Sequence, residues 1–155
     1  MTRLTLRTAS VLLLALALAG CGTSSVTLRS PTGDKTLTVK VEVADDAKEQ
    51  EKGLMNRTTM DADAGMLFVF KSPQMLRFWM KDTKIPLDIL FFDEAGDFVS
   101  FAAMQPCIAD PCPVYKSAAL SIYALEVNKG YRDEHAIGVG WKIDVNQIRK
   151  ISRPT

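Results

Sequence analysis

"RFWMKDTKIPLDILFF", residues 77–92, decides the fold, because strand-forming residues flank a short group of turn residues. Large apolar and β-branched side chains favour extended backbone, whereas Pro86 cannot continue the interior of a strand. The stretch therefore predicts two strands, residues 76–81 and 87–92. Side chains alternate along a strand, so the first strand has an apolar face and a polar face that carries Arg77, Trp79 and Lys81.

The rest of the chain continues this pattern of short strands. A clean apolar–polar alternation predicts a strand at 36–44, and one helix is expected at 45–54, between an aspartate cap and Gly53. Further strands are expected at 65–70, 98–104, 121–127 and 142–145. Many short strands with little helix predict an all-β fold, a jelly-roll-like antiparallel sandwich or barrel with one or two short helices.

Residues 1–20, MTRLTLRTASVLLLALALAG, have the parts of an export signal. Two arginines precede an apolar run of about nine residues, which is too short to span a bilayer. Leu18-Ala19-Gly20-Cys21 resembles the lipobox of bacterial lipoprotein precursors. The resemblance implies that Cys21 receives a diacylglyceryl group and an acyl chain such as palmitate, and an ordinary secretory signal is the alternative.

A lipidated Cys21 attaches the mature chain to a membrane surface without spanning it. Gly22 stands where an aspartate commonly retains Gram-negative lipoproteins at the inner membrane. The sequence therefore favours the cell envelope, and in a Gram-negative cell the periplasmic face of the outer membrane. Residues 21–34 are small and polar and predict a tether, followed by one domain at residues 35–150.

Charge and cysteine content narrow the classes of function. Without the two arginines of the signal, the 19 basic residues fall to 17 against 18 acidic residues, so nothing indicates nucleic-acid binding. Cys107 and Cys112 then remain for a disulfide, a metal site or a redox pair. Four residues separate them, unlike the two of thioredoxin-type motifs, and an oxidising compartment favours the disulfide.

Six strings of the sequence have a familiar order and spacing: KGLMNRTTM, GMLFVF, FWMKDTKIPLDILFFDEAG, CIADPCPVY, YALEVNKGY and IGVGWKI. Together they resemble the domain of unknown function 192 family over roughly residues 35–145. The resemblance implies a compact all-β domain of jelly-roll-like type, often exported and lipid-anchored, without an assigned activity. Trp141 departs from the pattern, because a polar residue is expected there.

The polar face of residues 76–81 is the first candidate for a site. A tryptophan between two cations can stack on a sugar ring while the cations contact an anionic group. A solvent-facing strand, on which the cation stems pack along the indole, produces the same pattern and is the commoner case. The candidate ligand-binding residues are Arg57, Trp79, Lys81, Asp88 and Glu126.

Asp88 and Glu126 are carboxylates within apolar strands, an arrangement that can also serve as an acid–base pair for glycan hydrolysis. Either could instead neutralise a cation or accept backbone N–H groups. No nucleophile or metal cluster accompanies them, so the sequence favours a binding module over an enzyme. The methionines after Met1 are scattered over expected core positions and His135 is the single histidine, which predicts no metal and no cofactor.

The sequence therefore predicts a lipid-anchored cell-envelope protein that acts as a binding or accessory module without catalysis. An envelope glycan or a small anionic molecule is the expected ligand, and the membrane is the expected partner of Cys21. Two alternatives stay open. One is an envelope hydrolase that uses Asp88 and Glu126, and the other is a structural module for a protein partner, which an exposed apolar patch would indicate.

Overall fold

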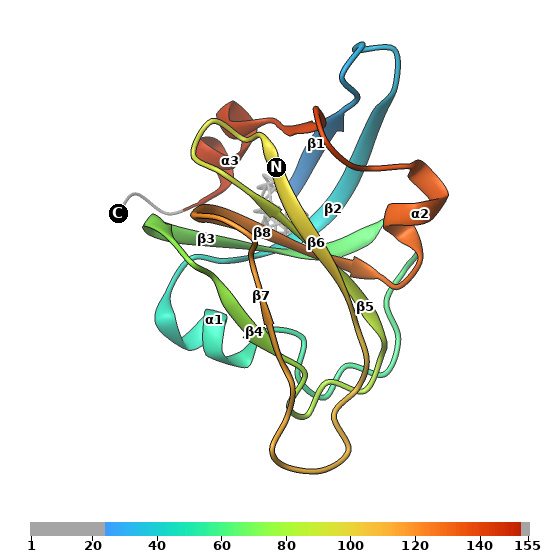
Figure 1. Ribbon diagram of the computed structural model, residues 1–155, viewed down its shortest axis with the longest axis vertical. Helices are drawn as coiled ribbons and strands as arrows, with labels where there is room; N and C mark the ends of the chain where they lie inside the picture. Colours follow the sequence, from blue (N-terminus) through green and yellow to red (C-terminus); the bar gives the residue numbers. More distant parts are fainter. Residues whose placement is uncertain (1–23, 153–155) are drawn as a thin grey trace, which may run out of the picture.

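The computed structural model describes residues 24–152, which form nine strands and three short helices (Figure 1). The strands are β1 (Ser24–Arg29), β2 (Thr36–Ala44), β3 (Ala64–Gln74), β4 (Arg77–Trp79), β5 (Leu87–Phe92), β6 (Phe98–Met104), β7 (Val114–Lys116), β8 (Ser121–Asn128) and β9 (Lys142–Ile143). The helices are α1 (Ala47–Lys52), α2 (Tyr131–His135) and α3 (Val145–Ile151). No helix in this part of the chain has the length and apolar character needed to cross a membrane. The predicted signal peptide and Cys21 lie outside the described residues.

Seven strands form one curled sheet in the order β6-β5-β8-β3-β2-β1-β9. Neighbouring strands are antiparallel except β2 and β3, which run parallel because the chain passes through α1 before it re-enters the sheet. The ends of the sheet meet, since Asp97 bridges Lys142 and the Ile143 N–H donates to the Gly96 carbonyl oxygen at 2.8 Å. The sheet is a curled half-barrel whose two ends touch only through these contacts among the described residues.

Each face of the curled sheet carries its own apolar cluster, because side chains of the central strands alternate between two buried sides. On β5, Leu90 belongs to the first cluster together with Ile148 of α3, whereas Phe91 belongs to the second. Strand β4 covers the second cluster: the Phe78 ring centre lies 4.9 Å from that of Phe68 and 5.8 Å from that of Phe91. This second face is the one that positions the candidate site.

The predicted all-β fold is confirmed, and residues 77–92 do divide into two strands. These strands belong to different sheets, because β4 pairs only with β7 among the described strands while β5 lies within the curled sheet (Figure 1). The expected alternation around Trp79 also holds. Leu76, Phe78 and Met80 are buried, whereas Arg77 and Trp79 face solvent.

The predicted tether at residues 21–34 is wrong for its central part. Ser24–Arg29 forms β1, which pairs with β2 on one side and β9 on the other. Val26 and Leu28 are fully buried in the first cluster, and the small polar residues around them conceal this pattern in the sequence. The folded domain therefore already includes Ser24 and does not begin at Lys35.

The predicted last strand, residues 142–145, ends at Ile143. The Asp144 side chain accepts hydrogen bonds from the backbone N–H groups of Asn146 and Gln147, which starts α3 in place of further strand. The predicted helix at 45–54 is confirmed as α1, which ends at Gly53.

Candidate ligand pocket beside strand β4

The outer face of β4 carries the stripe predicted around Trp79. Arg77 and Trp79 lie opposite Lys116 and Val114 of β7, and the indole is 47% exposed. The Nζ atom of Lys81 is 5.5 Å from the centre of the indole ring, which is within range of a cation–π contact. The stripe therefore presents an accessible aromatic ring with a cation already positioned over it.

A narrow pocket lies between this stripe and the last turn of α1. Its cavity volume is about 30 Å³, enough for a small water-sized group in the interior, and its mouth is open to solvent. Its lining is formed by Gln50, Glu51, Lys52, Gly53, Leu54, Met55, Phe68, Phe78, Trp79, Lys81, Thr83 and Glu126. Trp79 and Glu51 are exposed, whereas Thr83 and Glu126 are buried, so the pocket runs from a charged rim to an interior with two polar groups.

Glu126 is the buried carboxyl group of this pocket. It belongs to β8, between Met66 of β3 and Ile89 of β5, and only 4% of the residue is exposed. Within residues 24–152 no hydrogen bond or ion pair reaches its carboxyl group, and burial alone raises its pKa from 4.5 to about 8. Burial therefore favours the protonated carboxyl group at neutral pH, and no described residue forms a hydrogen bond with it.

Thr83 and Gly53 also line the pocket, and neither was predicted as a site residue, although Gly53 was predicted as the end of the helix. The Thr83 hydroxyl donates to the Lys81 carbonyl oxygen at 3.4 Å, which leaves its own oxygen able to accept a hydrogen bond. Gly53 ends α1 with a φ of 46°, in the left-handed region that favours glycine. Both residues lie within the quoted family strings, which is the sequence signal that could have identified them.

Asp88 does not belong to this pocket. It shares the first face of β5 with Leu90, whereas Glu126 points to the second face of the sheet. The Asp88 Oδ2 atom accepts hydrogen bonds from the backbone N–H groups of Gly130 and Arg132, at 2.9 and 3.1 Å. The structure therefore gives Asp88 a role in holding the start of α2 and does not bring it together with Glu126.

Arg57 also lies apart, in a neighbouring groove. Its Nη2 atom is 2.7 Å from the Glu42 Oε1 atom, and the groove walls include Lys40, Met60 and Asp61. The groove has a volume of about 270 Å³ and is open to solvent. Of the five predicted ligand-binding residues, the structure thus brings together Trp79, Lys81 and Glu126.

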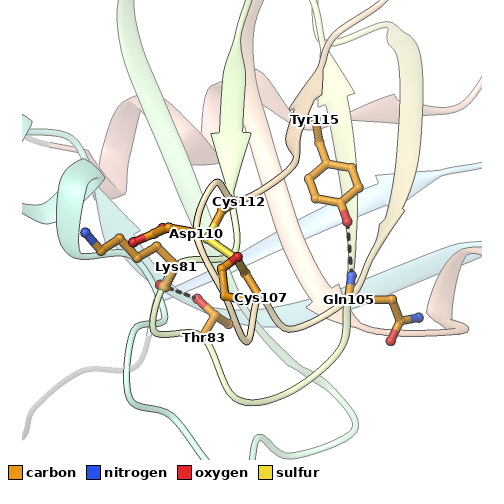
Figure 2. The surroundings of a disulfide bond; sticks show 8 residues. Lys81, Thr83, Gln105, Cys107, Asp110, Cys112 and Tyr115 are labelled. Carbon is orange, nitrogen blue, oxygen red and sulfur yellow. Dashed lines mark hydrogen bonds between the residues drawn. A yellow bond between two sulfur atoms is a disulfide. The ribbon is translucent and has the colours of Figure 1, made fainter.

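The predicted disulfide between Cys107 and Cys112 is present in the structure, with a Cα–Cα distance of 5.6 Å (Figure 2). Figure 2 shows Lys81 and Asp110 beside it, and these residues line a shallow hollow together with Asp82. Ile108, within the closed loop, is 99% exposed. The disulfide therefore fixes a short loop whose hollow shares Lys81 with the Glu126 pocket.

Fold and pocket together define a compact half-barrel β-domain with one small, partly buried polar cavity beside an exposed tryptophan. The chain belongs to the DUF192 family, described as an uncharacterised ACR, whose model matches residues 29–145. This finding confirms the family resemblance of the sequence strings. The family description assigns no activity.

Two solved structures are similar to this chain. One is a Sinorhizobium meliloti protein provisionally described as a transcription regulator, with a TM-score of 0.73 and 31% identity over 79% of this chain and 93% of that one. The other is a protein of unknown function from Novosphingobium aromaticivorans, with a TM-score of 0.72 and 30% identity over 83% of this chain and 89% of that one. No curated protein matches the chain.

Proposed function

We propose that this protein is a lipid-anchored binding module of the cell envelope, and that its ligand occupies the pocket formed by Trp79, Lys81 and Glu126. The observation that carries the proposal is the partnerless carboxyl group of Glu126, buried in a cavity whose rim has an exposed indole. A buried polar group without a partner costs folding free energy, and a bound ligand can supply the missing hydrogen bonds. The proposed role is binding without catalysis.

The ligand class follows from the rim of the pocket. The face of Trp79 suits a sugar ring, and the Lys81 ammonium beside it suits an anionic substituent. An envelope glycan or another small molecule with an anionic group satisfies both contacts. The two groups face outward beside the buried Glu126, so one ligand can contact the rim and the interior together.

The proposed anchor is Cys21, through its lipobox. Strand β1 begins at Ser24, so only Gly22 and Thr23 separate the lipidated residue from the curled sheet in the sequence. A module attached in this way stays close to the membrane surface, which in a Gram-negative cell is the periplasmic face of the outer membrane. Cys21→Ser should yield an unprocessed or soluble species, measured by fractionation and lipid labelling, and lipidated protein from this variant would refute the anchor.

The hydrolase alternative required Asp88 and Glu126 to act on the same bond. Their side chains point to opposite faces of the sheet, and Asp88 is occupied by two backbone N–H groups. Two carboxyl groups separated by a sheet cannot flank one glycosidic bond, which glycosidases require. We therefore do not propose this alternative.

A protein-partner role is a second candidate, favoured by exposed apolar side chains near the disulfide loop. Trp79 and Val114 form an exposed cross-strand pair, and Ile108 is fully exposed in the adjacent loop. Photo-crosslinkers placed at position 108 should capture one reproducible partner in intact cells, whereas a crosslinker at Val139 should not. Identical adduct patterns at both positions would count against this candidate.

Direct binding measurements test the proposed pocket. Purified full-length protein is titrated with envelope glycan fragments and small anionic molecules in a calorimeter, because Trp79→Ala would remove the reporter of a fluorescence titration. We expect binding that weakens at least tenfold in Trp79→Ala and is unchanged in Val139→Ala, an exposed residue outside the pocket. Equal behaviour of all three proteins across the panel would refute the pocket as a ligand site.

A further inference from the structure

We propose that the interior of the Glu126 pocket binds a primary ammonium group, carried by an amino sugar or by the side chain of a diamino acid. The inference rests on the proposed function and specifies which chemical group enters the buried end of the same pocket. Two polar groups reach that end from different elements, the Glu126 carboxyl of β8 and the Thr83 hydroxyl that follows β4. Both can accept hydrogen bonds, and an ammonium group is a compact triple donor.

The walls around these acceptors exclude bulkier polar groups. Leu54, Phe68 and Phe78 line the pocket, and the two phenylalanine rings contact each other edge to face. A slim methylene stem that ends in one cation fits such walls, because its carbons contact apolar side chains while the cation reaches Glu126. The ring of an amino sugar, whose hydroxyl groups need hydrogen-bond partners, would stay at the rim with only its ammonium turned toward the interior.

Charge complementarity favours a cation over a neutral donor. A carboxylate is disfavoured at this buried position when it is alone, and a directly bound cation is the partner that removes the penalty. Lys81 does not provide this cation, because its Nζ atom lies over the indole and burial alone accounts for the pKa of Glu126. Among the described residues, the interior thus has a carboxyl group and no cation.

The rim explains how the rest of such a ligand is held. Its charged residues are Glu51 and Lys52 of α1 and Lys81 beyond β4, so two cations and one anion surround the opening. Trp79 can stack on a sugar ring or cover an aliphatic stem. An amino sugar or a diamino acid with an anionic group can therefore place its ammonium inside and its anion at the rim.

Binding of a cation should release one proton. Burial raises the pKa of Glu126 to about 8, and pairing with ammonium favours the carboxylate, so the carboxyl proton passes to solvent. Affinity for a lysine-type ammonium, which stays charged throughout this range, should therefore rise between pH 6 and pH 8. The charged groups that line the pocket together with Glu126 are Glu51, Lys52 and Lys81.

The test uses purified full-length protein and two matched pairs of probes in calorimetric titrations. Nα-acetyl-lysine is compared with its Nε-acetylated form, and glucosamine with N-acetylglucosamine, because acetylation removes the charge and keeps the scaffold. We expect the free amine of at least one pair to bind at least tenfold more tightly than its acetylated partner. The pair that shows this difference identifies the source of the ammonium.

Variants locate the effect. Glu126→Gln should weaken the free amine at least tenfold and abolish proton release, measured in two buffers of different ionisation enthalpy, while Glu94→Gln, an exposed carboxylate outside the pocket, should leave both unchanged. Thr83→Val provides a second interior variant and should weaken the same probe by a smaller factor. Equal affinity of Glu126→Gln and wild type for the amine would overturn the inference.

The remaining outcomes separate the two proposals. Binding of acetylated probes or neutral glycans that Trp79→Ala abolishes, with no preference for the amine, overturns the ammonium inference and supports the pocket as a ligand site. Absence of binding by every probe and by the wider panel overturns both proposals.

Discussion

Two buried carboxyl groups lie on adjacent strands of this protein and have opposite surroundings. Asp88 of β5 is 3% exposed and Glu126 of β8 is 4% exposed. In the strand register Asp88 lies opposite Val127, and Glu126 lies opposite Ile89. Asp88 accepts two backbone hydrogen bonds, whereas no described residue contacts the Glu126 carboxyl with a polar group. Because the two residues are buried to nearly the same extent, their hydrogen bonds distinguish them. Asp88 has partners and is a structural carboxylate, whereas Glu126 lacks them and is a candidate binding group.

The largest expected effect concerns the satisfied carboxylate. Asp88→Ala removes the acceptor for the Gly130 and Arg132 N–H groups and should lower the free energy of unfolding by about 3 to 4 kcal/mol. Urea unfolding of the full-length protein measures this loss. Asp88→Asn keeps one acceptor oxygen and should lose much less, so equal losses in both variants would contradict the hydrogen-bonding role.

Glu126→Gln should have the opposite sign. Below about pH 4.5 the carboxyl is protonated in the folded and unfolded states, and it has no effect on stability. Between pH 4.5 and about 8 the unfolded chain loses this proton while the folded protein keeps it, so wild-type stability falls as pH rises. Glutamine removes this dependence and should stabilise the protein by about 3 kcal/mol at pH 7.

Unfolding midpoints between pH 5 and pH 8 measure this difference between wild type and Glu126→Gln. The gap should be small at pH 5 and widen toward pH 8. Glu51→Gln, at the exposed rim of the same pocket, serves as the control and should follow wild type at every pH. A difference in unfolding midpoint that stays constant with pH would show that the Glu126 carboxyl group has a partner.

The disulfide loop offers a smaller effect on the same side of the molecule as Glu126. Replacement of Cys107 and Cys112 by serine opens a six-residue ring and should lower stability by about 2 kcal/mol. Thermal unfolding of the double variant measures this loss. The pH dependence due to Glu126 should persist in it, and loss of that dependence would indicate that the loop controls the burial of the pocket.

Trp79→Ala should change stability least. The indole is 47% exposed and contributes little to either apolar cluster, so the unfolding free energy should stay within about 0.5 kcal/mol of wild type. The same denaturation experiment, paired with the fluorescence-independent calorimetric titration, separates folding from binding. A large loss of stability would show that Trp79 has a packing role and would weaken its assignment to ligand binding.

Part of this picture could be predicted from the sequence. Alternation in residues 76–81 correctly separates the exposed Trp79 from the buried Phe78, because strand periodicity reports which side chains share a face. The same logic cannot relate faces of different strands. Asp88 and Glu126 both stand among apolar neighbours, and only the register of β5 with β8 places them on opposite sides.

Other features depend on contacts that are distant in sequence. Strand β1 lies in a segment of small polar residues, so the sequence did not predict it. Its pairing with β2 buries Val26 and Leu28. The parallel pairing of β2 with β3 and the short strand β7 leave no clear periodic signal, since both depend on how the chain returns to the sheet. The separation of Arg57 from Trp79 likewise follows from its pairing with Glu42.

The meeting of the two ends of the curled sheet also bears on how this protein behaves when many copies share one surface. Exposed strand edges are templates on which other chains add as further strands, and molecules concentrated in two dimensions meet often. Here β9 has only two residues. An ion pair between Lys142 and Asp97, at 2.7 Å, connects it to the turn before β6. We expect this short, charged seam to suppress edge-to-edge aggregation among crowded copies.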